Sequence, residues 1–122
     1  MNRISEILIQ QYKDLCKERS LLEDEIRNLP VGSIQQKKIK NGTYYYRQFR
    51  EGGTVKTEFI PNVELEEIQN KINRRKDIEK RLKEIKEEIG QVIRGLGSDI
   101  YTIEGFEDFQ ASSFHVLNET YT

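Results

Sequence analysis

The sequence is short of the residues that build compact cores and reactive centres. Its 122 residues include no tryptophan, one cysteine, one histidine and two prolines, and 35% of them are hydrophobic against 34% charged. An ordinary globular domain has about 45–50% apolar and about 25% charged residues. This composition disfavours an enzyme built around a pocket. It suits long helices that each bury a single apolar stripe.

The scarcity of cysteine and of apolar runs restricts the compartment in which we expect the protein and the metal sites that it could form. One cysteine excludes an internal disulfide, and small secreted domains usually need such bonds, so we expect a cytoplasmic protein. The single cysteine and the single histidine lie far apart in sequence, which argues against a zinc site. Cys16 is interpreted as a packing residue and His115 as a surface residue. The run Ile7-Leu8-Ile9 is too short for a signal peptide or a membrane-spanning helix.

Motifs for catalysis are also missing. The sequence has no glycine-rich nucleotide-binding motif and no serine nucleophile elbow. Carboxylates alternate with lysine and arginine, and pairs four residues apart such as Glu79 and Lys83 are typical of ion pairs that support a helix. We therefore expect a non-enzymatic protein with no cofactor, no metal, no small-molecule substrate and no membrane partner.

The two prolines separate three regions of different periodicity. Before Pro30, residues 4–29 are predicted to form a helix with a 4-3 heptad spacing that Arg19 interrupts. After Pro61, residues 62–94 are predicted to form a second helix, with Asn62 as its N-cap. The first stripe consists of Leu8, Tyr12, Leu15, Arg19, Leu22, Ile26 and Leu29. The second consists of Leu65, Ile68, Ile72, Ile78, Leu82, Ile85, Ile89, Val92 and Leu96.

Residues 31–60 have the alternation and turn residues of β-strands. Three strands are predicted, at residues 34–40, 43–50 and 54–60, joined by turns at Asn41-Gly42 and at Glu51-Gly52-Gly53. The period of two places Tyr44 and Tyr46 on one face of the sheet and Arg47 on the other.

The predicted fold is α+β. Residues 1–97 form an antiparallel two-helix coiled-coil hairpin connected by a three-stranded antiparallel β-meander, and residues 98–122 form an acidic, aromatic C-terminal extension. Because two single-stripe helices bury little by themselves, we expect the chain to form a homo-oligomer.

The net charge of −1 averages over segments of opposite charge. Residues 31–60 carry six basic and two acidic side chains, whereas residues 101–122 carry four acidic and no basic ones. Lysine and arginine interleaved with aromatic residues on strands are what nucleic-acid readers use. Two other interpretations stay open: the tyrosines line a buried face of the sheet while the cations keep it soluble, or the sheet binds a protein. The candidate binding residues are Lys37, Lys38, Tyr44, Tyr46, Arg47, Arg50, Lys56, Arg74 and Arg75.

Arg74 and Arg75 come early in the second predicted helix, so they are expected either to extend a positive surface or to pair with carboxylates of the first helix. These carboxylates are Glu23, Asp24 and Glu25.

Between Leu22 and Ile89 the sequence resembles a family of small bacterial and archaeal domains of unknown function. The motifs are Leu29-Pro30-Val31-Gly32-Ser33, then Tyr44-Tyr45-Tyr46, then Gly53-Thr54-Val55-Lys56, then a helix. Many relatives carry cysteines before the aromatic strand; these are absent here, so no metal role carries over. Such relatives look like cargo of phages and mobile elements. The strands are also similar to the arm-site DNA-binding module of integrases.

The resemblance and the charge pattern together predict a phage or mobile-element protein that engages nucleic acid or a nucleoprotein complex through its basic, aromatic sheet. Two alternatives remain. One is an anti-CRISPR-like inhibitor that binds a host defence nuclease complex, with the acidic extension occupying a basic channel. The other is a structural, oligomerising adaptor.

Overall fold

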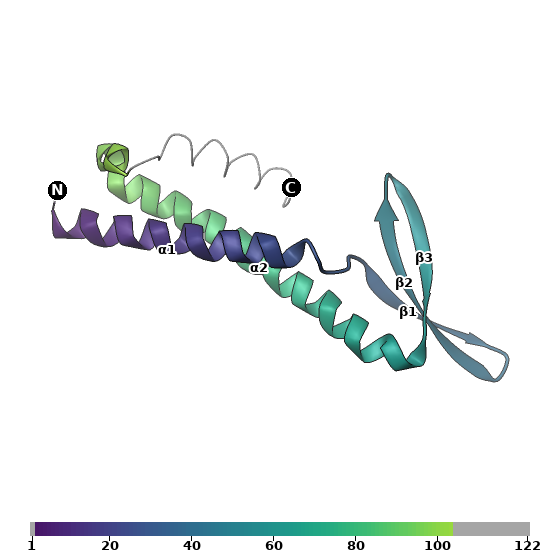
Figure 1. Cartoon of the computed structure of the whole chain (residues 1–122). Helices are drawn as coiled ribbons and strands as arrows, with labels where there is room; N and C mark the ends of the chain where they lie inside the picture. Colours follow the sequence, from purple (N-terminus) through teal and green to yellow (C-terminus); the bar gives the residue numbers. More distant parts are fainter. Residues whose placement is uncertain (1, 104–122) are drawn as a thin grey trace. The chain divides into compact units, whose positions relative to one another are not determined.

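The structure, a computed structural model, describes residues 2–103 and is α+β, with two helices and one three-stranded antiparallel sheet (Figure 1). In chain order the elements are α1 (Arg3–Ile26), β1 (Ser33–Ile39), β2 (Gly42–Glu51), β3 (Thr54–Ile60), the short 3-10 helix η1 (Asn62–Glu64), α2 (Leu65–Leu96) and the 3-10 helix η2 (Gly97–Thr102). Among residues 2–103, no helix has the length and apolar character needed to cross a membrane.

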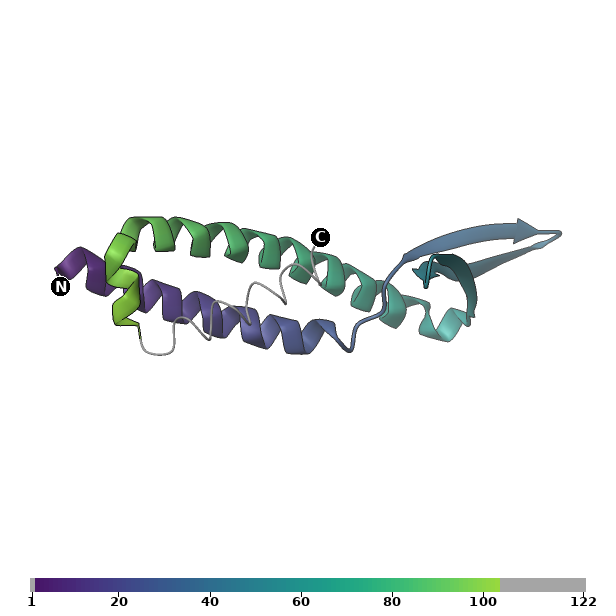
Figure 2. The same ribbon diagram turned by 90° about the horizontal axis from the view of Figure 1, so that it is seen from above.

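The contacts divide the chain into two compact units. The helical unit consists of the described parts of Met1–Asp24 and Glu79–Thr122, and the sheet unit is Glu25–Ile78. In the helical unit, α1 and α2 run antiparallel and side by side (Figure 2). Ser5 Oγ, near the start of α1, donates a hydrogen bond to Asp99 Oδ2 in η2, at 2.7 Å.

Most positions of the apolar stripes predicted from the sequence are buried, while Leu8, Leu22, Leu65 and Ile68 are half-buried. Along α2 the stripe is buried without interruption from Ile78 to Leu96, through Leu82, Ile85, Ile89 and Val92. On α1, Tyr12 and Leu15 are buried, and so is Cys16 beside them. Burial raises the pKa of the Cys16 thiol, which fits the interpretation of this cysteine as a packing residue.

Arg19, which the sequence predicts as a break in the stripe, is part of the buried seam. Its side chain is 5% exposed, and its Nε lies 3.7 Å from Glu23 Oε1, one turn further along α1. A buried guanidinium is tolerated only where a counter-charge compensates for lost hydration. Arg19 is therefore an ionic position among the buried residues of α1.

The first predicted helix boundary is wrong at its C-terminal end. The helix ends at Ile26 rather than at Leu29. Arg75 of α2 donates hydrogen bonds from Nη1 to the carbonyl oxygens of Ile26 and Leu29, at 2.9 Å each. The last carbonyls of a helix have no partner within it. The Ile26 carbonyl oxygen accepts from the Leu29 N–H at 3.1 Å, and Arg75, 49 residues away in sequence, supplies it with a second donor and bonds to Leu29 just before Pro30.

The start of the second helix also differs from the prediction. Residues 62–64 form a 3-10 turn in which the Glu64 N–H donates to the Pro61 carbonyl oxygen, and α2 begins only at Leu65. The cap of this turn is Pro61, with no side-chain cap hydrogen bond, so the prediction of Asn62 as an N-cap is wrong. The helix continues to Leu96 and stops at Gly97, whose φ of 55° suits the left-handed position that ends helices.

The sheet has the predicted order β1-β2-β3, with one turn shifted. Gly52 and Gly53, with φ of 57° and 81°, connect β2 to β3 as expected. Between β1 and β2 the closing pair is Ile39 with Gly42. The two-residue loop is therefore Lys40-Asn41 rather than Asn41-Gly42, and Lys40 adopts a positive φ of 54°.

The predicted C-terminal extension is described only at its start. Ile100 and Ile103 are buried within or directly after η2. The rest of the predicted extension, residues 104–122 with His115, lies outside the described residues.

Candidate nucleic-acid interface

The register of the strands sorts the sheet residues onto two faces. Tyr46 lies opposite Gln35 on β1 and Phe59 on β3, whereas Arg47 lies opposite Glu58. Residues directly opposite each other share a face, and the faces alternate along each strand. We call the first the aromatic face; it consists of Ser33, Gln35, Lys37, Ile39, Tyr44, Tyr46, Gln48, Arg50, Val55, Thr57 and Phe59. We call the other the ion-pair face; it consists of Ile34, Gln36, Lys38, Thr43, Tyr45, Arg47, Phe49, Glu51, Thr54, Lys56, Glu58 and Ile60.

Four of the five charged side chains of the ion-pair face pair with one another, and the fifth is Lys38. Arg47 donates to Glu58 Oε2 from Nε at 3.2 Å and from Nη2 at 2.7 Å, and its Nη1 donates to the Val31 carbonyl oxygen. The guanidinium also lies 3.9 Å from the centre of the Phe49 ring. Lys56 Nζ is 3.4 Å from a carboxylate oxygen of Glu51. Arg47 therefore ties β2 to β3 and to the segment that precedes β1.

The aromatic face differs in charge and in exposure. It carries two cations, Lys37 and Arg50, and no carboxylate. Tyr44 is 41% exposed and Phe59 56%. Within the described chain Arg50 makes no ion pair. This face combines exposed rings with positive charge that no sheet carboxylate on the same side offsets.

The rings of the aromatic face are held by contacts within it. Tyr46 and Phe59 meet edge to face, with centroids 5.7 Å apart and an interplanar angle of 67°. The Lys37 ammonium lies 4.8 Å from the centroid of the Tyr46 ring, within cation–π range. Tyr44 is exposed, whereas Tyr45 and Tyr46 are half-buried.

Arg74 and Arg75 belong to α2 and contact the C-terminal end of α1 and the residues that follow it. Arg74 donates to both carboxylate oxygens of Glu25, at 2.6 and 2.9 Å, and these hydrogen bonds lower the pKa of Glu25 and raise that of Arg74. Arg75 bonds to backbone carbonyls as described above. The pairing alternative is thus the one that the structure shows for Arg74.

Comparison with known protein families gives one match. A domain of unknown function, DUF6788, is found at residues 12–70. The matched range contains most of α1, the whole sheet and the start of α2, and it is consistent with the resemblance to a small family of unknown function. No curated protein and no solved structure matches the chain.

The structure brings together four of the nine candidate residues and separates the others. Lys37, Tyr44, Tyr46 and Arg50 share the aromatic face. Lys38, Arg47 and Lys56 lie on the ion-pair face, and Arg74 and Arg75 belong to α2.

Sequence reasoning missed Phe59, although a signal for it existed. A two-residue Gly52-Gly53 turn fixes the pairing of β2 with β3, and counting back from that turn places Phe59 opposite Tyr46.

Gly42 has a specific role beneath Tyr44. A Cβ at residue 42 would lie 2.9 Å from Cε2 and from the hydroxyl oxygen of Tyr44, which is closer than real Cβ contacts. The phenol of Tyr44 therefore covers the backbone of residue 42, and a side chain there would displace it. This glycine is needed for the close approach of a ring rather than for a positive φ.

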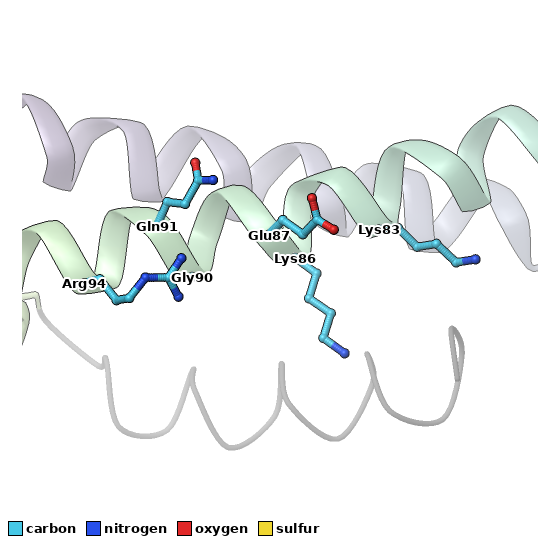
Figure 3. A pocket seen from close by; sticks show the side chains of 6 residues that line it. All are labelled: Lys83, Lys86, Glu87, Gly90, Gln91 and Arg94. Atoms are coloured by element: carbon cyan, nitrogen blue, oxygen red, sulfur yellow. The ribbon is translucent and has the colours of Figure 1, made fainter.

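Sequence reasoning did not find a shallow groove on α2 in the helical unit. It is lined by Lys83, Lys86, Glu87, Gly90, Gln91 and Arg94 (Figure 3). Three cations and one carboxylate line it. Among residues 2–103, no cluster of histidine, cysteine and carboxylate side chains could hold a metal ion.

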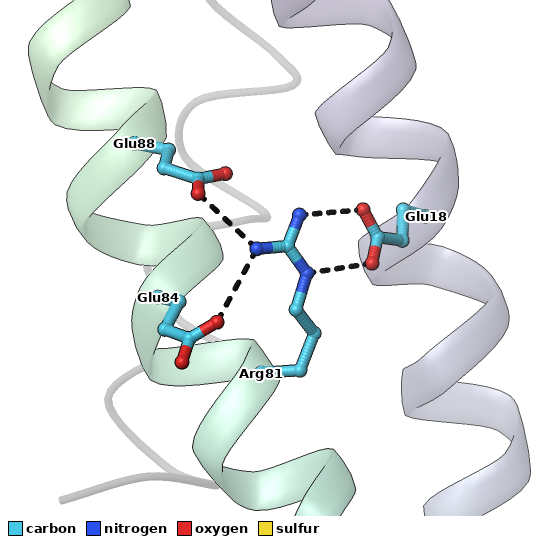
Figure 4. Close-up of polar contacts among 4 residues, drawn as sticks. All are labelled: Glu18, Arg81, Glu84 and Glu88. Atoms are coloured by element: carbon cyan, nitrogen blue, oxygen red, sulfur yellow. Dashed lines mark hydrogen bonds and ion pairs between the residues drawn. The ribbon is translucent and has the colours of Figure 1, made fainter.

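A carboxylate cluster in the helical unit is an ion-pair network. Arg81 donates to both oxygens of Glu18 across the helices, at 2.7 and 2.8 Å, and lies 3.2 Å from Glu88 and 3.4 Å from Glu84 on its own helix (Figure 4). The hydrogen bonds from Arg81 hold the pKa of Glu18 below its ordinary value. These carboxylates are occupied by a guanidinium, which suits helix pairing rather than proton transfer.

Proposed function

We propose that this protein is a non-enzymatic binding protein that engages nucleic acid, alone or within a nucleoprotein complex, through the aromatic face of its sheet. The observation that carries the proposal is the composition of that face: exposed rings of Tyr44 and Phe59, the cations Lys37 and Arg50, and no carboxylate. Cations neutralise phosphates, and aromatic rings stack on bases.

The exposure of the sheet supports a binding role. A small sheet usually needs a hydrophobic face packed on something else to be stable. Here Val55 and Phe59 remain about half exposed on the aromatic face, at 48% and 56%. An apolar face that also carries unopposed positive charge fits a polyanion better than it fits a neutral protein surface.

The test is a salt titration of binding with a matched pair of double variants. The full chain is titrated against labelled DNA and RNA oligonucleotides between 50 and 200 mM salt. Lys37→Gln with Arg50→Gln removes both cations of the aromatic face, and we expect the slope of log K against log salt to fall by about 1.4–1.8, since each neutralised phosphate contributes ~0.7–0.9.

The control double variant is Lys38→Gln with Lys56→Gln, which removes the same charge from the ion-pair face. If the control weakens binding as much as the test variant does, total charge and not the aromatic face is responsible. Absence of any salt-dependent binding to DNA or RNA would sink the proposal.

We also propose that the helices form an antiparallel coiled-coil hairpin and that the chain self-associates in the cytoplasm. The unbroken buried spacing of α2 from Ile78 to Leu96 supports the coiled coil. Sedimentation equilibrium of the full chain tests self-association, and a monomer at all concentrations contradicts it. The phage or mobile-element origin rests on the family resemblance alone. The anti-CRISPR-like and adaptor functions stay predictions, because no observation on the described residues favours either.

A further inference from the structure

We propose that the ligand of the aromatic face is a single-stranded nucleic acid, DNA or RNA, rather than a duplex. This inference rests on the proposed function and specifies its substrate class. It follows from how few cations the face has and from how its rings are placed.

The number of cations on the aromatic face is too small for binding dominated by phosphates. Strand β1 has seven residues, which span about 23 Å at ~3.3 Å per residue. A duplex of that length carries about 13 phosphate charges, because it has one per ~1.7 Å of axis. The face offers only Lys37 and Arg50 against them. Phosphate contacts therefore supply a minor part of the affinity, and the rings must supply the rest.

The rings contribute fully only when base faces are accessible. Inside a duplex the bases stack on one another, and a protein reads their edges with polar side chains. In a single strand each base has a free π-face that an aromatic side chain covers. A face rich in exposed rings and poor in cations thus matches the single strand.

Of the three aromatic rings on the aromatic face, two are placed to stack on bases. Tyr46 meets Phe59 edge-on and has the Lys37 ammonium 4.8 Å from its centroid, so its own surface is partly occupied. Tyr44 rests over Gly42 and remains 41% exposed. Phe59 is 56% exposed. We assign base stacking to Tyr44 and Phe59, with Lys37 and Arg50 as phosphate contacts.

The experiment compares three probes of one mixed sequence with the full chain: a labelled 16-nucleotide single-stranded DNA, the same sequence as RNA, and the blunt DNA duplex. Fluorescence anisotropy at 50 mM salt gives the three affinities. We expect at least one single-stranded probe to bind 10-fold or more tightly than the duplex. The DNA and RNA arms distinguish the two sources of a single strand.

Ring variants test the stacking positions directly. Tyr44→Leu and Phe59→Leu should each weaken single-strand binding about 5- to 150-fold, the range for loss of one stacked base. Tyr44→Phe keeps the ring and should bind as the unchanged chain does. Thermal melting of each variant shows whether it is folded. Because the chain has no tryptophan, quenching of tyrosine fluorescence by an unlabelled strand gives an independent signal that Tyr44→Phe should reduce.

The outcomes separate this inference from the proposed function. Equal or tighter binding of the duplex, with the salt slope still dependent on Lys37 and Arg50, overturns the single-strand inference and leaves the proposed function standing. Single-strand binding that survives both leucine variants in folded protein overturns the assignment of Tyr44 and Phe59. Failure to bind any of the three probes overturns both proposals.

Discussion

Replacing Arg75 with methionine should destabilise the sheet unit by removing the side chain that closes the end of α1. Arg75 Nη1 donates to the carbonyl oxygens of Ile26 and Leu29 at 2.9 Å, and both bonds are partly buried. Methionine keeps most of the aliphatic stem of arginine, so the change removes the guanidinium with little loss of packing.

The size of the effect follows from these two bonds. A hydrogen bond to a charged group contributes ~1.5–3 kcal/mol. The Ile26 carbonyl oxygen keeps the Leu29 N–H as a donor, so the loss there is smaller than at the Leu29 carbonyl oxygen. Because Arg75 is half exposed and water can replace part of the loss, we expect the free energy of unfolding to fall by about 2 kcal/mol in total.

Urea denaturation measures this change, and hydrogen exchange locates it. The amides of residues 27–32 should lose protection in Arg75→Met, while those of the helical unit should not. The control is Lys76→Met, the exposed neighbour on α2, which should change stability by less than about 0.5 kcal/mol. Equal stability of the two variants would refute the claim that Arg75 closes α1.

Three further predictions concern a turn, a ring and an ion pair. Lys40→Gly relieves the positive φ of 54° and should raise the free energy of unfolding by up to about 1 kcal/mol, measured by urea titration; a decrease would contradict the turn geometry. Gly42→Ala should displace Tyr44 and weaken single-strand binding while the melting temperature stays within a few degrees; unchanged affinity in anisotropy would count against the Tyr44 platform. Because Arg81 holds the pKa of Glu18 below its ordinary 4.5, the pair stabilises the fold above that pH and its contribution is lost as the pH falls through the lowered pKa. Glu18→Gln should therefore flatten the acid side of a stability-against-pH curve, and since Glu18 is 41% exposed we expect less than about 1 kcal/mol; an unchanged curve would show that the pair contributes nothing.

The differences between expectation and structure lie at the end of α1, at Arg19 and in the first hairpin turn. The helix α1 ends at Ile26 rather than at the expected Leu29, and Arg75 donates a hydrogen bond to the Ile26 carbonyl oxygen. Arg19 was expected to interrupt a stripe and is instead buried within it beside Glu23. The first hairpin turn lies one residue earlier than expected, because Gly42 pairs with Ile39. The Tyr44 ring lies over Gly42.

The sequence by itself determined the two helices, their buried stripes, the three strands and the glycine turn at Gly52-Gly53. These features depend on periodicity and on turn chemistry, which are local and are written in consecutive residues. The tertiary structure alone decided which cations are neutralised. Arg74 meets Glu25 across 49 residues and Arg47 meets Glu58 across a strand pair, while Arg50 and Lys37 share a face with no acid. Ion pairs depend on register and on contacts between distant segments. A count of charges along residues 31–60 therefore revealed a basic sheet, and only the fold showed how its charged side chains are divided between the two faces.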